Sequence, residues 1–154
     1  MKKNSAFFVF GFMHKAVLAG QFIFLGVMFY LGYSKTMLPP LVAQEKILQV
    51  AAIVFTVTAM YVGISIFKKK MALIKENPLA EAKEKFKKYR QACMLQWSLT
   101  EAPVLICGIC YFLTGNIAFL ALGALPFLFF VTLAPSKIKI ITQLQISESE
   151  LDEL

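Results

Sequence analysis

A single acidic side chain, Glu101, stands within a long apolar stretch of the sequence. From residue 91 to residue 136 no other residue is charged, and a charge at the centre of a membrane helix costs about 2.5–3.5 kcal/mol on the insertion scale. Pro103 follows two residues later, and its missing amide N–H leaves the carbonyl of residue 99 without a helical partner. An acid beside a weak point in the backbone suits ion or proton binding, with Gln21 and Thr100 as polar partners.

Two structural roles compete with ion or proton binding at Glu101. Ser98 and Glu101 have the spacing of a capping box, so that a lipid-buried helix could begin at Ser98, with Trp97 in the interfacial aromatic belt. A deeply placed Glu101 could also join two helices through a hydrogen bond, which contributes about 1 kcal/mol in a membrane. The residues alone leave these alternatives open.

Cys107 and Cys110 lie three residues apart, on one face of the same predicted helix. A quinone-linked membrane thiol oxidoreductase uses such a pair, and they are the redox candidates of this chain. That chemistry also needs shuttle cysteines in an external loop, whereas the third cysteine, Cys93, falls at the opposite end of the span. We therefore expect Cys107 and Cys110 to be small packing residues.

Other catalytic and cofactor patterns are missing from the sequence. His14 is the only histidine, which excludes bis-histidine haem ligation within this chain, and no residues have metal-ligand spacing. The sequence has no glycine-rich phosphate loop, no nucleophile elbow and no paired carboxylates. We expect a protein without enzymatic activity, cofactor or metal.

The elements that must position these residues are membrane-spanning helices. The chain has 154 residues, 58% of them hydrophobic and 16% charged, against about 25% charged in soluble domains. A crossing needs about 20 apolar residues, and the sequence has four such runs: Ala16–Ser34, Ile47–Phe67, Cys93–Leu113 and Ile117–Ala134. Ile47–Phe67 has no polar face at helical period, which argues against a buried helix of a soluble protein.

The distribution of lysine and arginine predicts the orientation of these spans. The loop of residues 68–91 carries most of the positive charge, and cytoplasmic loops hold the lysine and arginine excess. Residues 1–15, this loop and the tail of residues 136–154 are therefore predicted to be cytoplasmic. The net charge of +7 then indicates anionic lipid as a partner, and no motif points to nucleic acid. The lipid-contacting candidates are Lys68, Lys69, Lys70, Lys87, Lys88 and Arg90.

The same loop is predicted to contain an amphipathic helix. Asn77 and Pro78 form a good helix start, an N-cap followed by proline at the first helical position. The apolar residues that follow at spacings of three and four make one stripe, namely Leu79, Ala82, Phe86, Tyr89 and Cys93. We expect this helix to run into the third span, with its stripe on the lipid; docking of a partner is the alternative.

Two patterns bear on how the spans pack. Residues 21–31 resemble residues 103–113 at a shift of 82, with Gly26 aligned with Gly108, which suggests a parallel repeat of two helical hairpins. Small residues four apart, such as Ala16 with Gly20, allow close packing within one bundle, in a homo-oligomer or in a larger membrane complex. Gly123 and Pro126 are predicted to bend the fourth span.

Residues 97–154 contain a Glu-small-Pro step entering the third span, a Thr-Gly-Asn hairpin and a Pro-Ser exit into an acidic tail. In these features the second half of the chain resembles a group of small four-span membrane proteins from Bacteroidota-type bacteria. The resemblance implies a four-span layout and a bacterial inner membrane, and it implies no mechanism.

Together these patterns predict an all-α protein with one membrane domain over residues 1–154, a four-helix bundle built of two hairpins. The favoured function is a structural or accessory role, within itself or in a larger membrane complex. A proton- or ion-coupled transporter using Glu101 is the first alternative. A thiol oxidoreductase using Cys107 and Cys110 is the second.

Overall fold

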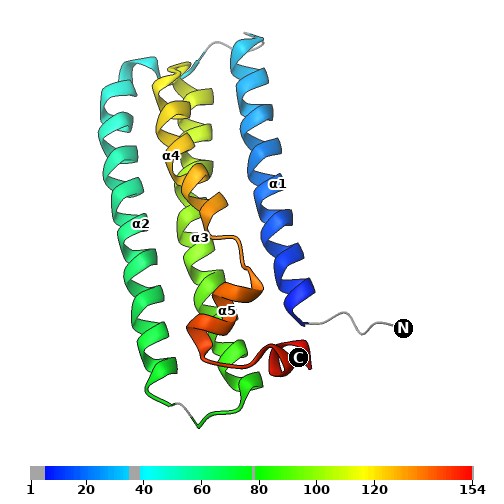
Figure 1. Cartoon of the computed structure of the whole chain (residues 1–154). Coiled ribbons are helices and arrows are strands. Elements are labelled where there is room, and N and C mark those ends of the chain that lie inside the picture. Colours follow the sequence, from blue (N-terminus) through cyan, green and yellow to red (C-terminus); the bar gives the residue numbers. More distant parts are fainter. Residues whose placement is uncertain (1–5, 35–38, 78, 154) are drawn as a thin grey trace.

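The computed structural model describes residues 6–34, 39–77 and 79–153, and its regular elements in these ranges are all helices (Figure 1). The α-helices are α1 (Ala6–Tyr33), α2 (Glu45–Lys75), α3 (Ala82–Thr114), α4 (Ala118–Thr132), α5 (Lys137–Leu144) and α6 (Glu148–Asp152), and a short 3-10 helix, η1 (Val42–Gln44), precedes α2. The predicted all-α class is confirmed.

Three helical segments are long and apolar enough to cross a membrane: α1, Val42–Lys75 and α3. Helices α4 and α5, taken together, are also long and apolar enough to cross a membrane, although the two helices are bent by 74° relative to each other. Large apolar side chains such as Phe22, Ile53 and Tyr61 are exposed on the outside of the molecule. Such a surface is compatible with a multi-pass membrane protein, because a soluble protein rarely exposes large contiguous apolar patches.

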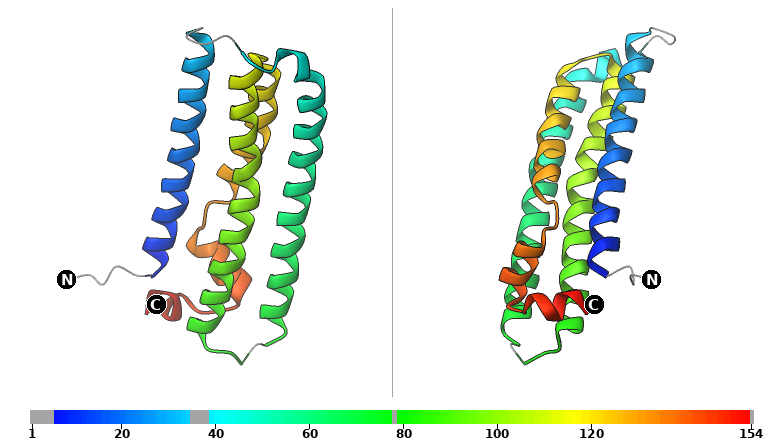
Figure 2. Two further views of the ribbon diagram at one scale, coloured as in Figure 1. Left: turned by 180° about the vertical axis from the view of Figure 1, so that it is seen from behind. Right: turned by 45° about the vertical axis from the view of Figure 1, so that its right-hand side comes forward.

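Helix α3 is the centre of the molecule, and α1 and α2 lie on opposite sides of it (Figures 1 and 2). A Cβ added to Gly63 of α2 would lie 3.3 Å from Leu99, and one added to Gly123 of α4 would lie 2.9 Å from Cys107. On the α1 side, Gly108 of α3 packs directly against Phe24. The glycines therefore mark the lines along which the helices approach α3 most closely.

Only one of the two predicted hairpins is tightly packed. Helices α3 and α4 are joined at Gly115, which has φ +73° and donates from its N to the carbonyl oxygen of Tyr111 at 2.7 Å. Glycine suits this left-handed position because it has no Cβ. The predicted repeat has no matching environments, because Gly108 is packed whereas a Cβ added at Gly26 would meet open space.

The lysine-rich end of the bundle, where α1 and α3 begin and α2 ends, differs from the prediction. The helix start at Asn77 is wrong, because Asn77 lies in a turn and α3 begins at Ala82; Pro78 lies outside the described residues. The stripe predicted to contact lipid is mostly buried within the protein, since Phe86 and Tyr89 pack against Phe10 of α1. Predicted lipid contact is therefore replaced by contact between helices.

The fourth span is bent at a different place from the one predicted. Gly123 and Pro126 lie within α4, and the chain turns by 74° only after Thr132. After this turn α5 and α6 fold back on the lysine-rich end, where Ile140 and Leu151 are fully buried. The tail is thus part of the core.

Candidate functional site

Glu101 lies inside α3, half buried. Trp97, one turn earlier, and Gly108, about two turns later, both contact α1, which places Glu101 at the edge of α3 beside α1. Ser98 and Ile109 on the same side are exposed. Among the described residues no hydrogen bond or ion pair reaches the Glu101 carboxyl group, so this acid stands without a partner at the protein boundary.

The capping role predicted for Glu101 is wrong. Helix α3 continues through this region from Ala82, and the Ser98 hydroxyl donates to the carbonyl oxygen of Met94 at 3.1 Å. A serine that bonds back to the preceding turn is an interior residue of a helix, not an N-cap. Trp97 is likewise buried against α1 and does not lie in an exposed aromatic belt.

The polar partners predicted for Glu101 are buried, but no hydrogen bond joins them to it. Gln21 of α1 is 0% exposed, and neither its amide nitrogen nor its amide oxygen has a partner among the described residues. The Thr100 hydroxyl donates to the carbonyl oxygen of Gln96 at 2.8 Å. Pro103 is buried in α3. The structure therefore assembles no closed coordination set from Glu101, Gln21 and Thr100.

The three cysteines are free thiols and all are buried in α3. Cys107 is covered by α4, whose Gly123 approaches its Cβ so closely that a methyl group would not fit. Cys110 packs in the same apolar cluster, with Ala52 and Phe119. Both redox candidates thus lie where a quinone or a partner thiol has no open approach.

A buried aromatic cluster at the lysine-rich end went unpredicted. Phe10 stacks on Trp97, with ring centroids 4.8 Å apart, and His14 stacks on Phe130 at 4.6 Å. His14 also donates from Nε2 to the carbonyl oxygen of Phe130 at 3.1 Å. The sequence contains a pattern that favours such a cluster, since Phe10 and His14 are four residues apart and would share one face of a helix. The cluster was missed because residues 1–15 were expected to precede the first span.

The six basic candidates are distributed around the lysine-rich end and do not form one site. Lys88 is bound to Glu84 at 2.7 Å, and Lys68 and Lys70 lie beside two different surface grooves. Arg90 and Lys87 line a third, with Glu81 and Glu84. Anionic lipid contact by these residues stays a prediction.

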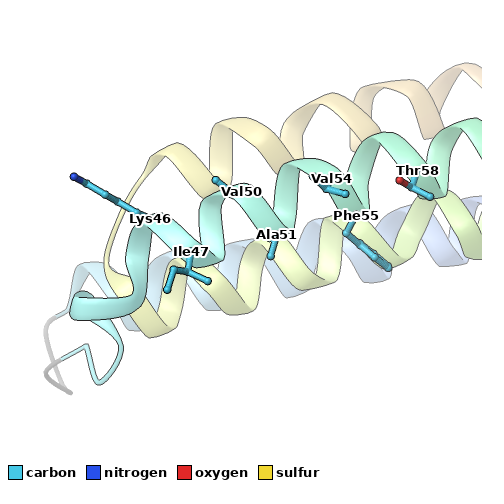
Figure 3. A pocket seen from close by; sticks show the side chains of 7 residues that line it. All are labelled: Lys46, Ile47, Val50, Ala51, Val54, Phe55 and Thr58. Carbon is cyan, nitrogen blue, oxygen red and sulfur yellow. The ribbon is translucent and has the colours of Figure 1, made fainter.

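The outward side of α2 carries a further depression (Figure 3). Its lining comes from α2 alone: Lys46, Ile47, Val50, Ala51, Val54, Phe55 and Thr58. A surface supplied by one helix and made almost entirely of apolar side chains lacks convergent polar groups, and it suits lipid or another helix better than a small polar ligand.

Within the described part of the chain, no three His, Cys, Asp or Glu residues come together to hold a metal ion. No protein-family model matches the sequence, and neither a curated protein nor a solved structure is significantly similar to it.

Proposed function

We propose that this chain is a small inner-membrane protein of structural or accessory type, which packs sideways against another membrane helix. The observation that carries the proposal is the unpartnered, half-buried carboxyl group of Glu101 at the edge of α3. An acid at that depth is costly unless a hydrogen-bond partner is supplied. A helix from a second copy or from a larger complex would supply it.

The surface around α1 supports lateral packing. Of its 28 residues only Phe10, His14 and Gln21 are buried. A Cβ added at Gly20 or Gly26 would meet no atom within 4 Å, so this helix has small residues on an uncovered side. Small residues allow two membrane helices to approach closely.

The orientation belongs to the same proposal. The lysine-rich end carries Lys68, Lys69 and Lys70 on α2 and Lys87 and Lys88 on α3. Because cytoplasmic segments hold the positive excess, this end is cytoplasmic, and so are both termini.

The test compares Glu101→Leu with Glu101→Gln by native mass spectrometry in a mild detergent. Glutamine can still form a hydrogen bond whereas leucine cannot, so we expect Glu101→Gln to keep the oligomer or the co-purifying partner and Glu101→Leu to lose it. Ser98→Ala, one turn earlier on the same exposed side, is the matched control and should behave as the unaltered protein. A monomer without partners in all samples would overturn the proposal.

Proton- or ion-coupled transport is the second candidate, and the buried, unpartnered amide of Gln21 favours it. A path for ions needs polar groups in the interior that are free to bind them. In liposomes, transport predicts a proton-dependent flux that Glu101→Gln and Glu101→Leu both abolish, because neither side chain can ionise. An accessory protein shows no such flux in any variant.

A further inference from the structure

A groove of about 590 Å³ lies between α2 and the bend that joins α4 to α5. Its volume falls within the range of about 300–1,000 Å³ that small-molecule sites occupy. Lys68 and Lys75 of α2 line it together with Gln96 of α3 and Gln143 of α5. Phe67 and Phe129 are among the apolar residues that complete the lining.

The groove exists because α4 is too short to cover the whole length of α2. Helix α4 has 15 residues, about 22 Å at 1.5 Å per residue, whereas α2 has 31. After Thr132 the chain turns by 74°, and α5 crosses the lysine-rich end. The last turns of α2 therefore face a space bounded by Phe129 on one side and by Gln143 of α5 on another.

Two glutamine side chains line this groove, Gln96 of α3 and Gln143 of α5. Gln96 is 6% exposed, and no hydrogen bond joins its side-chain amide to another described residue. The side-chain oxygen of Gln143 is buried, also without a partner in the described part of the chain. A buried acceptor without a partner costs about 1–3 kcal/mol, and this applies to the Gln143 oxygen. The groove thus offers amide groups to a polar ligand.

The charge of the groove selects an anion. Lys68 and Lys75 line it, and no carboxylate does so among the described residues. The two lysines are seven residues apart on one face of α2, and the apolar residues Met71 and Ala72 lie between them on the same face. A ligand with an anionic head and an apolar tail matches this lining, and basic pockets between membrane helices at the cytoplasmic side bind lipid headgroups.

We propose that this groove binds one anionic phospholipid at the lysine-rich end. The phosphate lies between Lys68 and Lys75, and the side-chain N–H groups of Gln96 and Gln143 donate to its oxygens. The side-chain oxygen of Gln143 accepts from a hydroxyl of the headgroup, and an acyl chain covers Phe67 and Phe129. The inference shares with the proposed function only the placement of the chain in a membrane.

The test measures lipid retention by native mass spectrometry of the full chain in detergent micelles, with phosphatidylglycerol and phosphatidylcholine as probes. We expect one phosphatidylglycerol to bind at least about tenfold more tightly than phosphatidylcholine. Because a lysine near an anionic lipid is worth roughly fivefold in affinity, Lys68→Gln with Lys75→Gln should weaken phosphatidylglycerol binding about 30-fold.

The matched control, Lys15→Gln with Lys69→Gln, removes the same charge from the same end but away from the groove, and should change affinity by less than about threefold. Gln96→Leu keeps both lysines, so it should weaken the binding of both lipids and leave the preference for phosphatidylglycerol in place. Circular dichroism and the fluorescence of Trp97 confirm that each variant is folded.

Equal weakening in the two double variants would show that only overall charge matters and would overturn the proposal. Equal retention of the two lipids by the unaltered protein would do the same. Either failure leaves the result for Glu101→Leu unaffected, because that experiment follows a protein partner at the opposite edge of α3.

Discussion

His14 Nε2 donates a hydrogen bond to the carbonyl oxygen of Phe130 across 3.1 Å, and the two rings stack with centroids 4.6 Å apart. Residue 14 lies on α1 and residue 130 lies near the end of α4. This contact therefore joins α1 to α4, close to the bend that follows Thr132.

Replacing His14 with leucine should destabilise the protein by about 1–3 kcal/mol, because both the hydrogen bond and the stacked ring are lost. The free energy of unfolding in mixed micelles measures this effect. Lys15→Gln changes the exposed neighbour and serves as the control. An unchanged unfolding curve for His14→Leu would show that α1 does not depend on this contact.

Phe10→Ala should alter the environment of Trp97, the only tryptophan in the chain. Phe10 is 0% exposed and stacks on Trp97, so truncation opens a cavity beside the indole and costs about 3–5 kcal/mol. We expect a red shift of the fluorescence maximum and a lower melting temperature. Phe12→Ala removes an exposed ring from the same helix and should leave both properties unchanged.

Gly123→Ala should force α3 and α4 apart. The added methyl group would lie 2.9 Å from the Cβ of Cys107, an atom that cannot move without its backbone, and overpacking of this kind costs about 1–3 kcal/mol. Thermal unfolding measures the loss. Gly11→Ala on α1 meets open space and should be neutral or slightly stabilising, because alanine favours helix. Equal losses in the two variants would contradict the close approach of α3 and α4.

The tail should loosen in acid through Glu150. The backbone N–H of Ser147 and then its hydroxyl bond to the Glu150 carboxylate, which holds the pKa of Glu150 below its ordinary value of 4.5. A lowered pKa means that the folded tail favours the carboxylate, so this stabilisation is complete above pH 4.5 and is lost as pH falls through the lowered pKa.

A carbon-13 NMR titration of the Glu150 carboxyl group measures that pKa directly. Ser147→Ala removes the hydroxyl and should move the pKa of Glu150 upward, toward 4.5. If the titration of Glu150 is the same in both proteins, the hydroxyl of the capping box contributes nothing to holding the tail.

The helices could be predicted from the sequence where they depend on neighbouring residues, such as capping residues, turn residues and apolar runs. Ser147 and Glu150, three residues apart, form a capping box, which is the motif that this spacing favours. The Thr-Gly-Asn hairpin is also present, since the turn at Gly115 ends α3. The four apolar runs correspond to the cores of α1 to α4, because a long run of apolar residues can be counted along the chain. Boundaries were less accurate, since α1 already begins at Ala6.

The candidate site was predictable only in part. The sequence singled out Glu101 because it is the sole charge in its stretch, but it also allowed Ser98 to be an N-cap, which the continuous α3 excludes. The apolar stripe through Phe86 and Tyr89 was predicted, but its contact with Phe10 of α1 was not. Helical periodicity shows that one face of a helix is apolar, and it does not show which part of the chain covers that face.

The amino-acid sequence by itself determined the helical class, the apolar runs and the single acid among them, since hydropathy, charge and turn residues act over a few neighbouring positions. Only the tertiary structure decided that α3 lies at the centre, that His14 bonds to Phe130 and that Gln96 and Gln143 meet in one groove. These contacts join residues far apart in the chain, and their geometry depends on how whole helices pack and on the 74° turn after α4.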